Sequence, residues 1–124
     1  MAGLTQLERA ALQAIFAEAG NLARGLDRLL DAEVLSRENT GGGFFTTLAA
    51  PIAPRRESLH LGEHVWVAVE GLDFGLGIIL HLHEQRLPLI EGYAVALEDT
   101  LQVNFAEVRF AMVSEPSAMP ADFG

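Results

Sequence analysis

Residues 75–94 read GLGIILHLHEQRLPLIEGYA, and this stretch predicts the central hairpin of a β-sheet. Apolar and β-branched residues fill both halves, which is typical of strands. We therefore expect strands over residues 75–83 and 86–94. Glu84 and Gln85 lie between the two and are predicted to form a two-residue hairpin loop.

The short loop determines which side chains of this hairpin would face each other. With two loop residues, the opposed pairs are expected to be Leu82–Leu87, Leu80–Leu89 and Ile78–Glu91. Glu91 would then continue a stripe of aliphatic side chains. A carboxylate in that position needs a partner, a proton or a place at the edge of the core.

We expect Arg37 to be the partner of Glu91, in an ion pair that fixes the order of the strands. Together with Tyr93, these two residues form a candidate polar pocket. A general acid–base role for Glu91, with a pKa raised by its apolar neighbours, is the catalytic alternative. No nucleophile or second positioned base is evident beside Glu91 in this arrangement.

The strand predicted over residues 64–70 precedes the hairpin and joins it through a turn at residues 71–74. Its valines alternate with other residues, so one face of the strand is aliphatic. If these valines share a face with the aliphatic residues of 76–82, the remaining side chains gather on the opposite face. That second face is expected to carry His64, Trp66, Ala68, Gly77, Ile79, His81 and His83, extended by Arg86 and Ile90.

Two functions suit this second face, beside a plain solvated surface. His81 and His83 would point to one side of their strand with His64 across from one of them, and three imidazoles in this arrangement would hold Zn²⁺. Large apolar side chains on an uncovered sheet face indicate instead a surface that binds a partner. The residues that favour a partner surface are Trp66, Ile79 and Ile90.

Helices are predicted in the N-terminal part of the chain. Thr5 and Glu8 have the spacing of a capping box, in which a hydroxyl and a carboxylate three residues apart cap the start of a helix. Apolar residues with helical spacing follow, and Gly20 suits a C-terminal stop, so a first helix is expected over residues 6–19. Leucines at positions 22, 26, 29 and 30 predict a second helix over residues 21–31.

Further strands are predicted over residues 33–38, 44–49 and 103–113. Residues 50–63 contain two prolines and are expected to be mostly loop, and residues 114–124 are expected to form a flexible tail. The predicted architecture is therefore a single α+β domain over residues 1–113. Two N-terminal helices would pack on one face of a mainly antiparallel sheet of about five or six strands.

The stretch SRENTGGGFFTTL, residues 36–48, places three consecutive glycines between two predicted strands. Nucleotide-binding glycine loops lead into a helix and follow the pattern G-x-G-x-x-G or end in Lys. Here the glycines lead into a strand, and no Lys follows. We predict a tight hairpin with positive φ angles within residues 39–42. Gly43 would then let another backbone or a ring approach closely.

The segments SRENTGGGFFT and GLDFGLGIILHLHEQRLPLIEGY together resemble a group of small bacterial proteins of unassigned function. Their pattern is S-R-E-x-T-G-x-G-F-F-T, then G-x-x-x-G-x-G-F-x-L and a hairpin into L-x-x-L-E-G-Y. The likeness covers residues 34–93, with Glu84-Gln85 where the group tends to have Asp-Gly and with AVALED after the motif where a Tyr/Gly/Asp-rich turn is expected. It implies a shared α+β fold and no activity. The polar members of the pattern are Arg37, Glu38, Thr40, Glu91 and Tyr93.

Charge and composition exclude several classes of protein. The 124 residues carry a formal charge of −9, which repels phosphate backbones, so nucleic-acid binding is not expected. The sequence contains neither Lys nor Cys, which excludes a Walker A loop, a Schiff base, a thiol nucleophile and a thiolate metal site. No apolar run is long enough to span a bilayer and no signal-peptide pattern is present, so we expect a cytoplasmic protein without a membrane partner.

The leading expectation is a non-enzymatic protein-interaction module that needs no cofactor. It would form a homodimer or bind another protein, in an immunity-like or adaptor-like role. The alternative is a small-molecule- or metal-binding protein, with Zn²⁺ as its cofactor and enzymatic activity as an option. The alternative sites are the face of His64, His81 and His83 and the pocket of Arg37, Glu91 and Tyr93.

Overall fold

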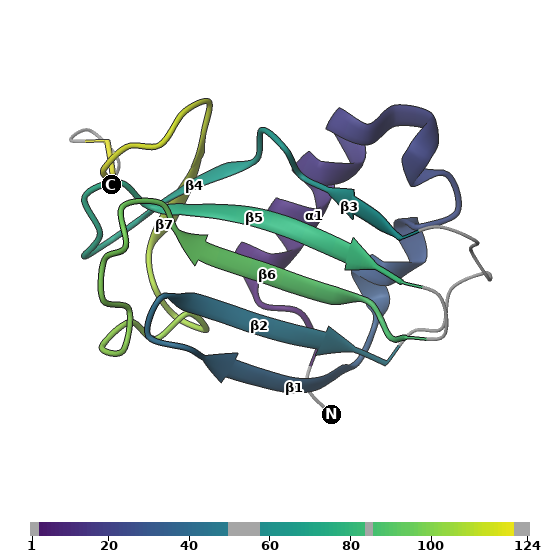
Figure 1. The fold of residues 1–124 in the computed structure, drawn as a ribbon, viewed down its shortest axis with the longest axis horizontal. Helices are drawn as coiled ribbons and strands as arrows, with labels where there is room; N and C mark the ends of the chain where they lie inside the picture. Colours follow the sequence, from purple (N-terminus) through teal and green to yellow (C-terminus); the bar gives the residue numbers. More distant parts are fainter. Residues whose placement is uncertain (1–2, 50–57, 84–85, 121–124) are drawn as a thin grey trace.

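The central hairpin is present as β5 (Leu76–Leu82) and β6 (Leu89–Ala94), which pair antiparallel at the middle of the sheet. A computed structural model describes residues 3–49, 58–83 and 86–120 of the chain. The loop predicted at Glu84 and Gln85 lies outside the described residues. Figure 1 shows the two strands side by side with the rest of the sheet built outward from them.

Seven strands form one sheet in the described part of the chain, and every pairing among them is antiparallel. The strand order is β1-β2-β6-β5-β4-β7, and β3 also pairs with β5. The remaining strands are β1 (Val34–Asn39), β2 (Gly43–Leu48), β3 (Leu59–Leu61), β4 (Trp66–Val69) and β7 (Phe110–Val113). The α+β class and the antiparallel sheet are confirmed. β3 exceeds the predicted strand count because it lies within residues 50–63, which were expected to be mostly loop.

One α-helix, α1 (Gln6–Ala19), starts and ends as the sequence predicts. Thr5 caps it and forms the capping box with Glu8, and Gly20 ends it with φ 58° and an N–H that donates to Phe16. This helix is too short and too polar to cross a membrane, and no other helix of the described residues can cross one.

The prediction of a second helix over residues 21–31 is wrong. The chain forms two 3₁₀ turns instead, η1 (Gly20–Ala23) and η2 (Asp27–Asp31). Gly25, at φ 81°, breaks the helical path between them. Leu22 is 57% exposed whereas Leu29 is fully buried, so the leucines with helical spacing do not share one face.

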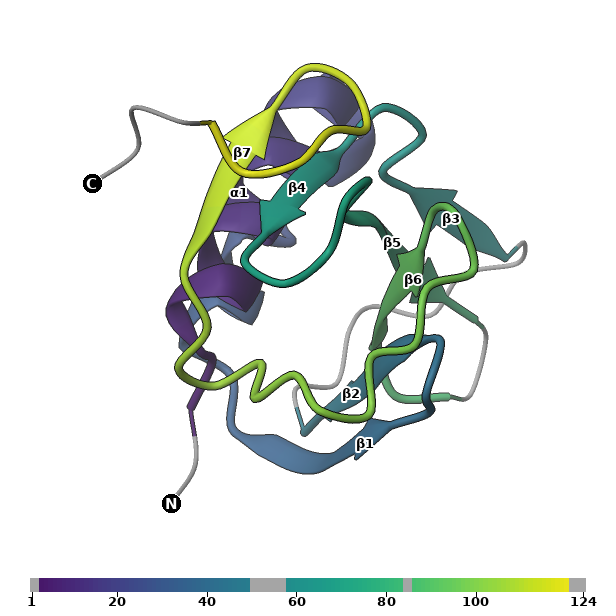
Figure 2. The ribbon, with the colours of Figure 1, turned by 90° about the vertical axis from the view of Figure 1, so that its left-hand side faces the viewer.

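The core lies between α1 and the aliphatic face of the sheet. Figure 2 shows the sheet end-on, curved, with α1 on its concave side. The fully buried side chains include Leu12 and Ile15 of the helix and Ile78 and Leu80 of β5. Each buried aliphatic side chain of this size contributes roughly 1.5–3 kcal/mol relative to an exposed one.

We call the sheet face turned away from α1 the outer face. Figure 1 shows this face toward the viewer, with no helix of the described residues in front of it. Its strand residues, read from the registers, include Phe45, Thr47, His60, Trp66, Gly77, Ile79, His81, Leu89, Glu91 and Tyr93.

The register of the β5–β6 hairpin differs by one residue from the prediction. Ile79 faces Glu91 and Leu80 faces Ile90, where Ile78 was expected to face Glu91. β6 begins only at Leu89, because Pro88 has no N–H to donate to the ladder. A shift of one residue moves every side chain to the other face. Glu91 therefore lies on the outer face, and Ile90 lies in the core with no exposure.

The hairpin of β1 and β2 confirms the interpretation of the glycine stretch. The N–H of Thr40 donates to the carbonyl of Gly43 across the turn, and Gly41 has φ 86°. A Cβ at residue 43 would overlap the carbonyl oxygen of Gly92 on β6. Gly43 is thus the position at which two backbones meet closely, as its sequence context predicts.

The strand predicted over residues 103–113 is mostly irregular, and only β7 is formed. Residues 95–109 instead run from β6 to β7 past the β1–β2 hairpin (Figure 2). Asn39 donates from its side chain to the carbonyl of Thr100, and Phe44 packs on Phe105 with ring centroids 4.9 Å apart. These contacts hold an irregular segment where extended pairing was expected.

Candidate metal centre

Three histidines meet on the outer face because two strands bring them there. His60 in β3 is directly opposite His81 in β5. His83 follows β5 two residues after His81, and alternate residues of a strand point to the same side. His60 and His81 each lie between two leucines that pack in or against the core, and His83 follows Leu82, so the alternation of apolar and polar residues fixes the outward direction of the rings.

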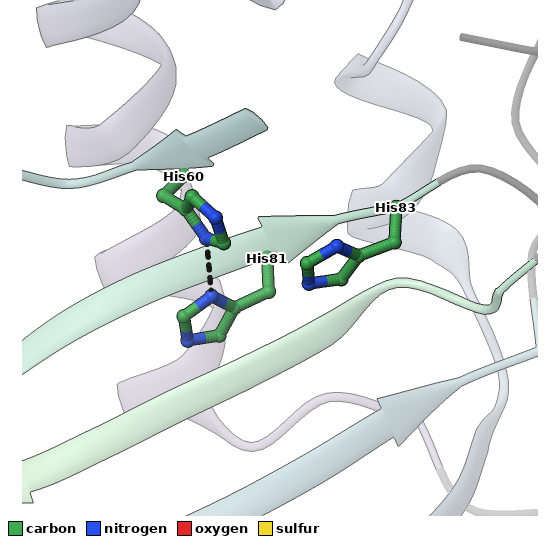
Figure 3. A group of neighbouring side chains, drawn as sticks. All are labelled: His60, His81 and His83. Carbon is green, nitrogen blue, oxygen red and sulfur yellow. Dashed lines mark hydrogen bonds between the residues drawn. The ribbon is translucent and has the colours of Figure 1, made fainter. Parts of the chain in front are cut away.

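The three rings lie close enough to share an ion. The Nδ1 atoms of His60 and His81 are 2.6 Å apart, and one nitrogen from each of the three rings fits within 4.8 Å of the others. Figure 3 shows the three imidazoles gathered as a triangle, with a hydrogen bond joining His60 to His81 and the His83 ring beside them. Their ring centroids are 4.8 Å apart for His60 and His81 and 5.2 Å for His60 and His83.

Two neighbours hold the rings from the other side. The Nε2 of His81 lies 2.8 Å from Oε1 of Glu91, and the Nδ1 of His83 lies 2.7 Å from the hydroxyl of Ser58. Because a carboxylate only accepts, His81 donates from Nε2 and leaves Nδ1 free of a proton in its neutral form. The His60 Nδ1–H then donates to this nitrogen. The arrangement is that of a carboxylate behind a ligand histidine in metal proteins.

The electrostatics of the cluster favour a neutral imidazole at His83. Partial burial, together with the positive charge that His60, Arg86 and His81 place nearby, lowers the pKa of His83 below its ordinary value. The neutral imidazole is the form that binds a metal. His83 is therefore poised to offer a lone pair at neutral pH.

His64 does not belong to this cluster, although it was expected to complete a metal site with His81 and His83. Its backbone N–H and its ring contact the carboxylate of Glu18 on α1, at 3.1 and 3.2 Å. His60 takes its place, because His64 lies in the turn between β3 and β4 and the strand that pairs with β5 at His81 is β3. The alternation Leu59-His60-Leu61 is the sequence signal that could have identified it.

The predicted polar pocket is not assembled. Arg37 faces the side of α1 and binds Glu8 with Nε at 2.9 Å and Nη2 at 2.7 Å. Glu91 binds His81 on the outer face. Tyr93 lies on the outer face against Gly77, and burial followed by the charge of Glu91 raises its pKa. The expected pairing of Arg37 with Glu91 is therefore wrong, because the register places the two residues on opposite faces.

Glu8 is the buried carboxylate that the sequence did not single out as the partner of Arg37. It is 2% exposed and accepts from the N–H of Thr5 and the hydroxyl of Thr46 in addition to Arg37. Burial opposes its ionisation, but the hydrogen bonds from Arg37, Thr46 and Thr5 outweigh burial and lower the pKa of Glu8. This network ties α1 to β1 and β2.

A pocket of about 210 Å³ lies beside that network. Its lining residues are Glu8, Arg37, Glu38, Asn39, Phe44, Val103, Asn104, Phe105 and Ala106. It contains Arg37 from the predicted pocket but neither Glu91 nor Tyr93. Most of its polar groups already have partners within the protein, which leaves the histidine cluster as the stronger candidate site.

The predicted partner-binding residues are divided between the two faces. Trp66 and Ile79 lie on the outer face and are partly exposed. Ile90 is fully buried in the core, so it takes no part in a surface. Leu89 takes the outward position that the sequence assigned to Ile90, because of the one-residue shift.

The outer face thus combines a cluster of three imidazoles with a neighbouring patch of apolar and aromatic side chains. Comparison of the chain with protein-family models, with curated proteins and with solved structures gives no match.

Proposed function

We propose that this protein binds a transition-metal ion, with Zn²⁺ as the principal candidate, through His60, His81 and His83. The observation that carries the proposal is the convergence of one nitrogen from each ring within 4.8 Å. Imidazole nitrogens are preferred ligands of zinc, and three of them form a common ligand set. The site differs from the sequence hypothesis by one residue, His60 in place of His64.

Binding needs only small movements of the rings. Zinc–nitrogen bonds of about 2.0–2.1 Å in a tetrahedral arrangement put neighbouring nitrogens roughly 3.3 Å apart. The His60–His81 separation of 2.6 Å would open, and the wider separations of up to 4.8 Å would close. The proton on Nδ1 of His60 would leave, or move to its Nε2, because the metal takes the lone pair. Rotation about the side-chain bonds supplies these changes without moving the strands.

The ligand type selects among metals. Three imidazoles without a carboxylate in the group suit borderline ions such as Zn²⁺, Co²⁺, Ni²⁺ and Cu²⁺, whereas Mg²⁺ and Ca²⁺ prefer oxygen ligands. The formal charge of −9 raises the local concentration of any cation near the protein. We therefore expect zinc to bind and magnesium to leave the site untouched.

The test is calorimetric titration of metal-free protein with Zn²⁺, combined with elemental analysis after dialysis. The intact protein should bind one ion per chain. His60→Ala and His81→Ala should each weaken binding at least about tenfold, because each removes a ligand. His64→Ala is the matched control and should bind as the unaltered protein does. Equal binding by all four proteins would reject the site.

A second candidate function, self-association through the outer face, is supported by a separate observation. Phe45, Trp66, Ile79, Leu89 and Tyr93 are partly exposed on that face, and no described helix covers it. A second copy of the chain would remove these side chains from water. Sedimentation equilibrium should show a dimer that Trp66→Glu disrupts. Met112→Glu, at an exposed position facing the other side of β7, should leave the dimer intact, and a monomer at all concentrations would exclude this candidate.

We also propose that the chain shares its α+β fold with the bacterial group that its S-R-E and L-x-x-L-E-G-Y motifs resemble. The glycines of those motifs support the proposal, because Gly43 and Gly92 lie where backbones and rings approach closely. Arg37 also supports the proposal, because it binds Glu8 and so joins β1 to α1. The residues that the two motifs share with this chain thus include positions that stabilise the fold.

A further inference from the structure

The donor set of the histidine cluster leaves a metal short of ligands. Within the described residues the cluster consists of three imidazoles and no carboxylate. Glu91, a described acid that contacts the cluster, is held at Nε2 of His81, away from the nitrogen that faces His60. Zinc takes four ligands, so three imidazoles leave one position to be filled from solution.

That position lies on the solvent side of the sheet. His60 is exposed, and His81 and His83 are partly exposed. The outer face has no described helix over it (Figure 1), so a small molecule can reach an ion held by the three rings. A buried structural zinc site would enclose its ion with four protein ligands instead.

The charge of the site favours an anion in that position. Three neutral imidazoles leave both positive charges of Zn²⁺ uncompensated. The negative charge of Glu91 would reach the metal only through the His81 ring, because the carboxylate accepts a hydrogen bond from Nε2 of that ring. A water molecule would occupy the open position, and a carboxylate from solution would displace it.

Apolar side chains lie beside the open position. Leu89 is directly opposite His81 on β6, and Ile79 lies two residues before His81 on the same side of β5. Both side chains are partly exposed. They would cover part of the aliphatic chain of a ligand whose carboxylate binds the metal.

We infer that the metal held by His60, His81 and His83 keeps an exchangeable fourth position, which takes a small organic carboxylate with an aliphatic chain that lies on Ile79 and Leu89. This inference rests on the proposed metal site and names the class of ligand for it. Acetate and hexanoate are suitable probes, since they share the carboxylate and differ in the length of the chain.

The experiment uses the protein loaded with Co²⁺, whose visible absorption reports the ligands around it. Azide is added first as a small anion without an aliphatic chain. A saturable change of the spectrum is expected, since azide would enter the open position. A cobalt spectrum that stays unchanged at high azide concentration would show a closed site and overturn the inference, while leaving the metal site itself in place.

Acetate and hexanoate are then compared on the same sample. Hexanoate should bind at least about fivefold more tightly than acetate, because its extra methylene groups are removed from water when they pack on the apolar side chains. Ile79→Ala should reduce that preference, and Met112→Ala, exposed on the other side of the sheet, should leave it unchanged. Equal binding of the two acids would overturn the assignment of the aliphatic carboxylate. Absence of cobalt binding would instead reject the proposed function.

Discussion

At the scale of single residues, Glu91 shows how one contact changes the role of a side chain. It accepts from Nε2 of His81 at 2.8 Å and so fixes which nitrogen of that ring faces the other histidines. Sequence patterns alone placed Glu91 in an aliphatic stripe and paired it with Arg37. Its actual place would make it a positioning residue for the proposed metal site.

Replacement of Glu91 by Ala should weaken zinc binding about 10- to 100-fold, as is typical for the removal of a carboxylate behind a ligand histidine. Glu91→Gln should have a smaller effect, because its amide oxygen still accepts from His81. Competition with a coloured chelator measures both affinities. Glu38→Gln, an exposed acid on β1, is the control and should bind zinc normally. An unaltered affinity in Glu91→Ala would contradict the positioning role.

Glu8 predicts how stability depends on pH. Its pKa in the folded protein is lowered from 4.5, chiefly because the hydrogen bonds from Arg37, Thr46 and Thr5 outweigh its burial. A group with a lowered folded pKa stabilises the protein above its unfolded pKa and loses that contribution as pH falls through the folded pKa. Urea unfolding between pH 7 and pH 3 should therefore show stability falling below about pH 4.5.

Glu8→Gln should remove most of this dependence and reduce stability at pH 7 by about 3 kcal/mol, because it leaves Arg37 without its charged partner. The value lies at the low end for such pairs, because the Arg37 side chain is 32% exposed. Glu63→Gln, at an exposed position, should match the unaltered protein at every pH. Parallel pH profiles for Glu8→Gln and the unaltered protein would show that Glu8 is not the group responsible.

At the scale of elements, close contacts between strands depend on glycines. Gly43 has φ 140° and lies against the backbone of Gly92, so β2 and β6 can pair at that point only without a side chain there. Gly77 accommodates the ring of Tyr93 in the same way. The close approach of these strands thus depends on glycines, which have no side chain at the points of contact.

Gly43→Ala should destabilise the protein by about 2–4 kcal/mol, the sum of backbone strain and overpacking. Gly42→Ala is a matched control, because a Cβ at residue 42 meets nothing within 4 Å. Chemical unfolding of both variants gives the comparison. Equal stability of the two variants would mean that β2 and β6 tolerate a wider spacing at this end.

At the scale of the whole molecule, the proposed metal would join β3 to β5. β3 has three residues and is preceded by a segment outside the described residues, so the ion would add a link at a short strand. An ion that binds only the folded chain stabilises it by about 2.7 kcal/mol at a concentration 100 times its Kd.

Calorimetry should show a rise in Tm of about 10 °C under those conditions. His60→Ala should abolish the rise and His64→Ala should retain it; a rise in both would place the ion elsewhere.

Local patterns were sufficient for much of this fold. The capping box of Thr5 and Glu8, the stop at Gly20 and the alternation around β4 and β5 each depend on residues a few positions apart, and they define α1 and the two faces of the sheet. The sequence alone therefore determined the α+β class, the boundaries of α1, the glycine hairpin and the outward direction of His81 and His83.

Tertiary structure decided the features that depend on register between distant segments. The register between β5 and β6 places Glu91 on the outer face and Ile90 in the core, the reverse of the predicted faces. The pairing of β3 with β5 places His60 opposite His81, while His64 lies in the turn between β3 and β4. The partner of Arg37 was decided by the packing of α1 against β1. A one-residue shift changes no local propensity but reverses the direction of every side chain in a strand, so only the assembled sheet determines which polar groups meet.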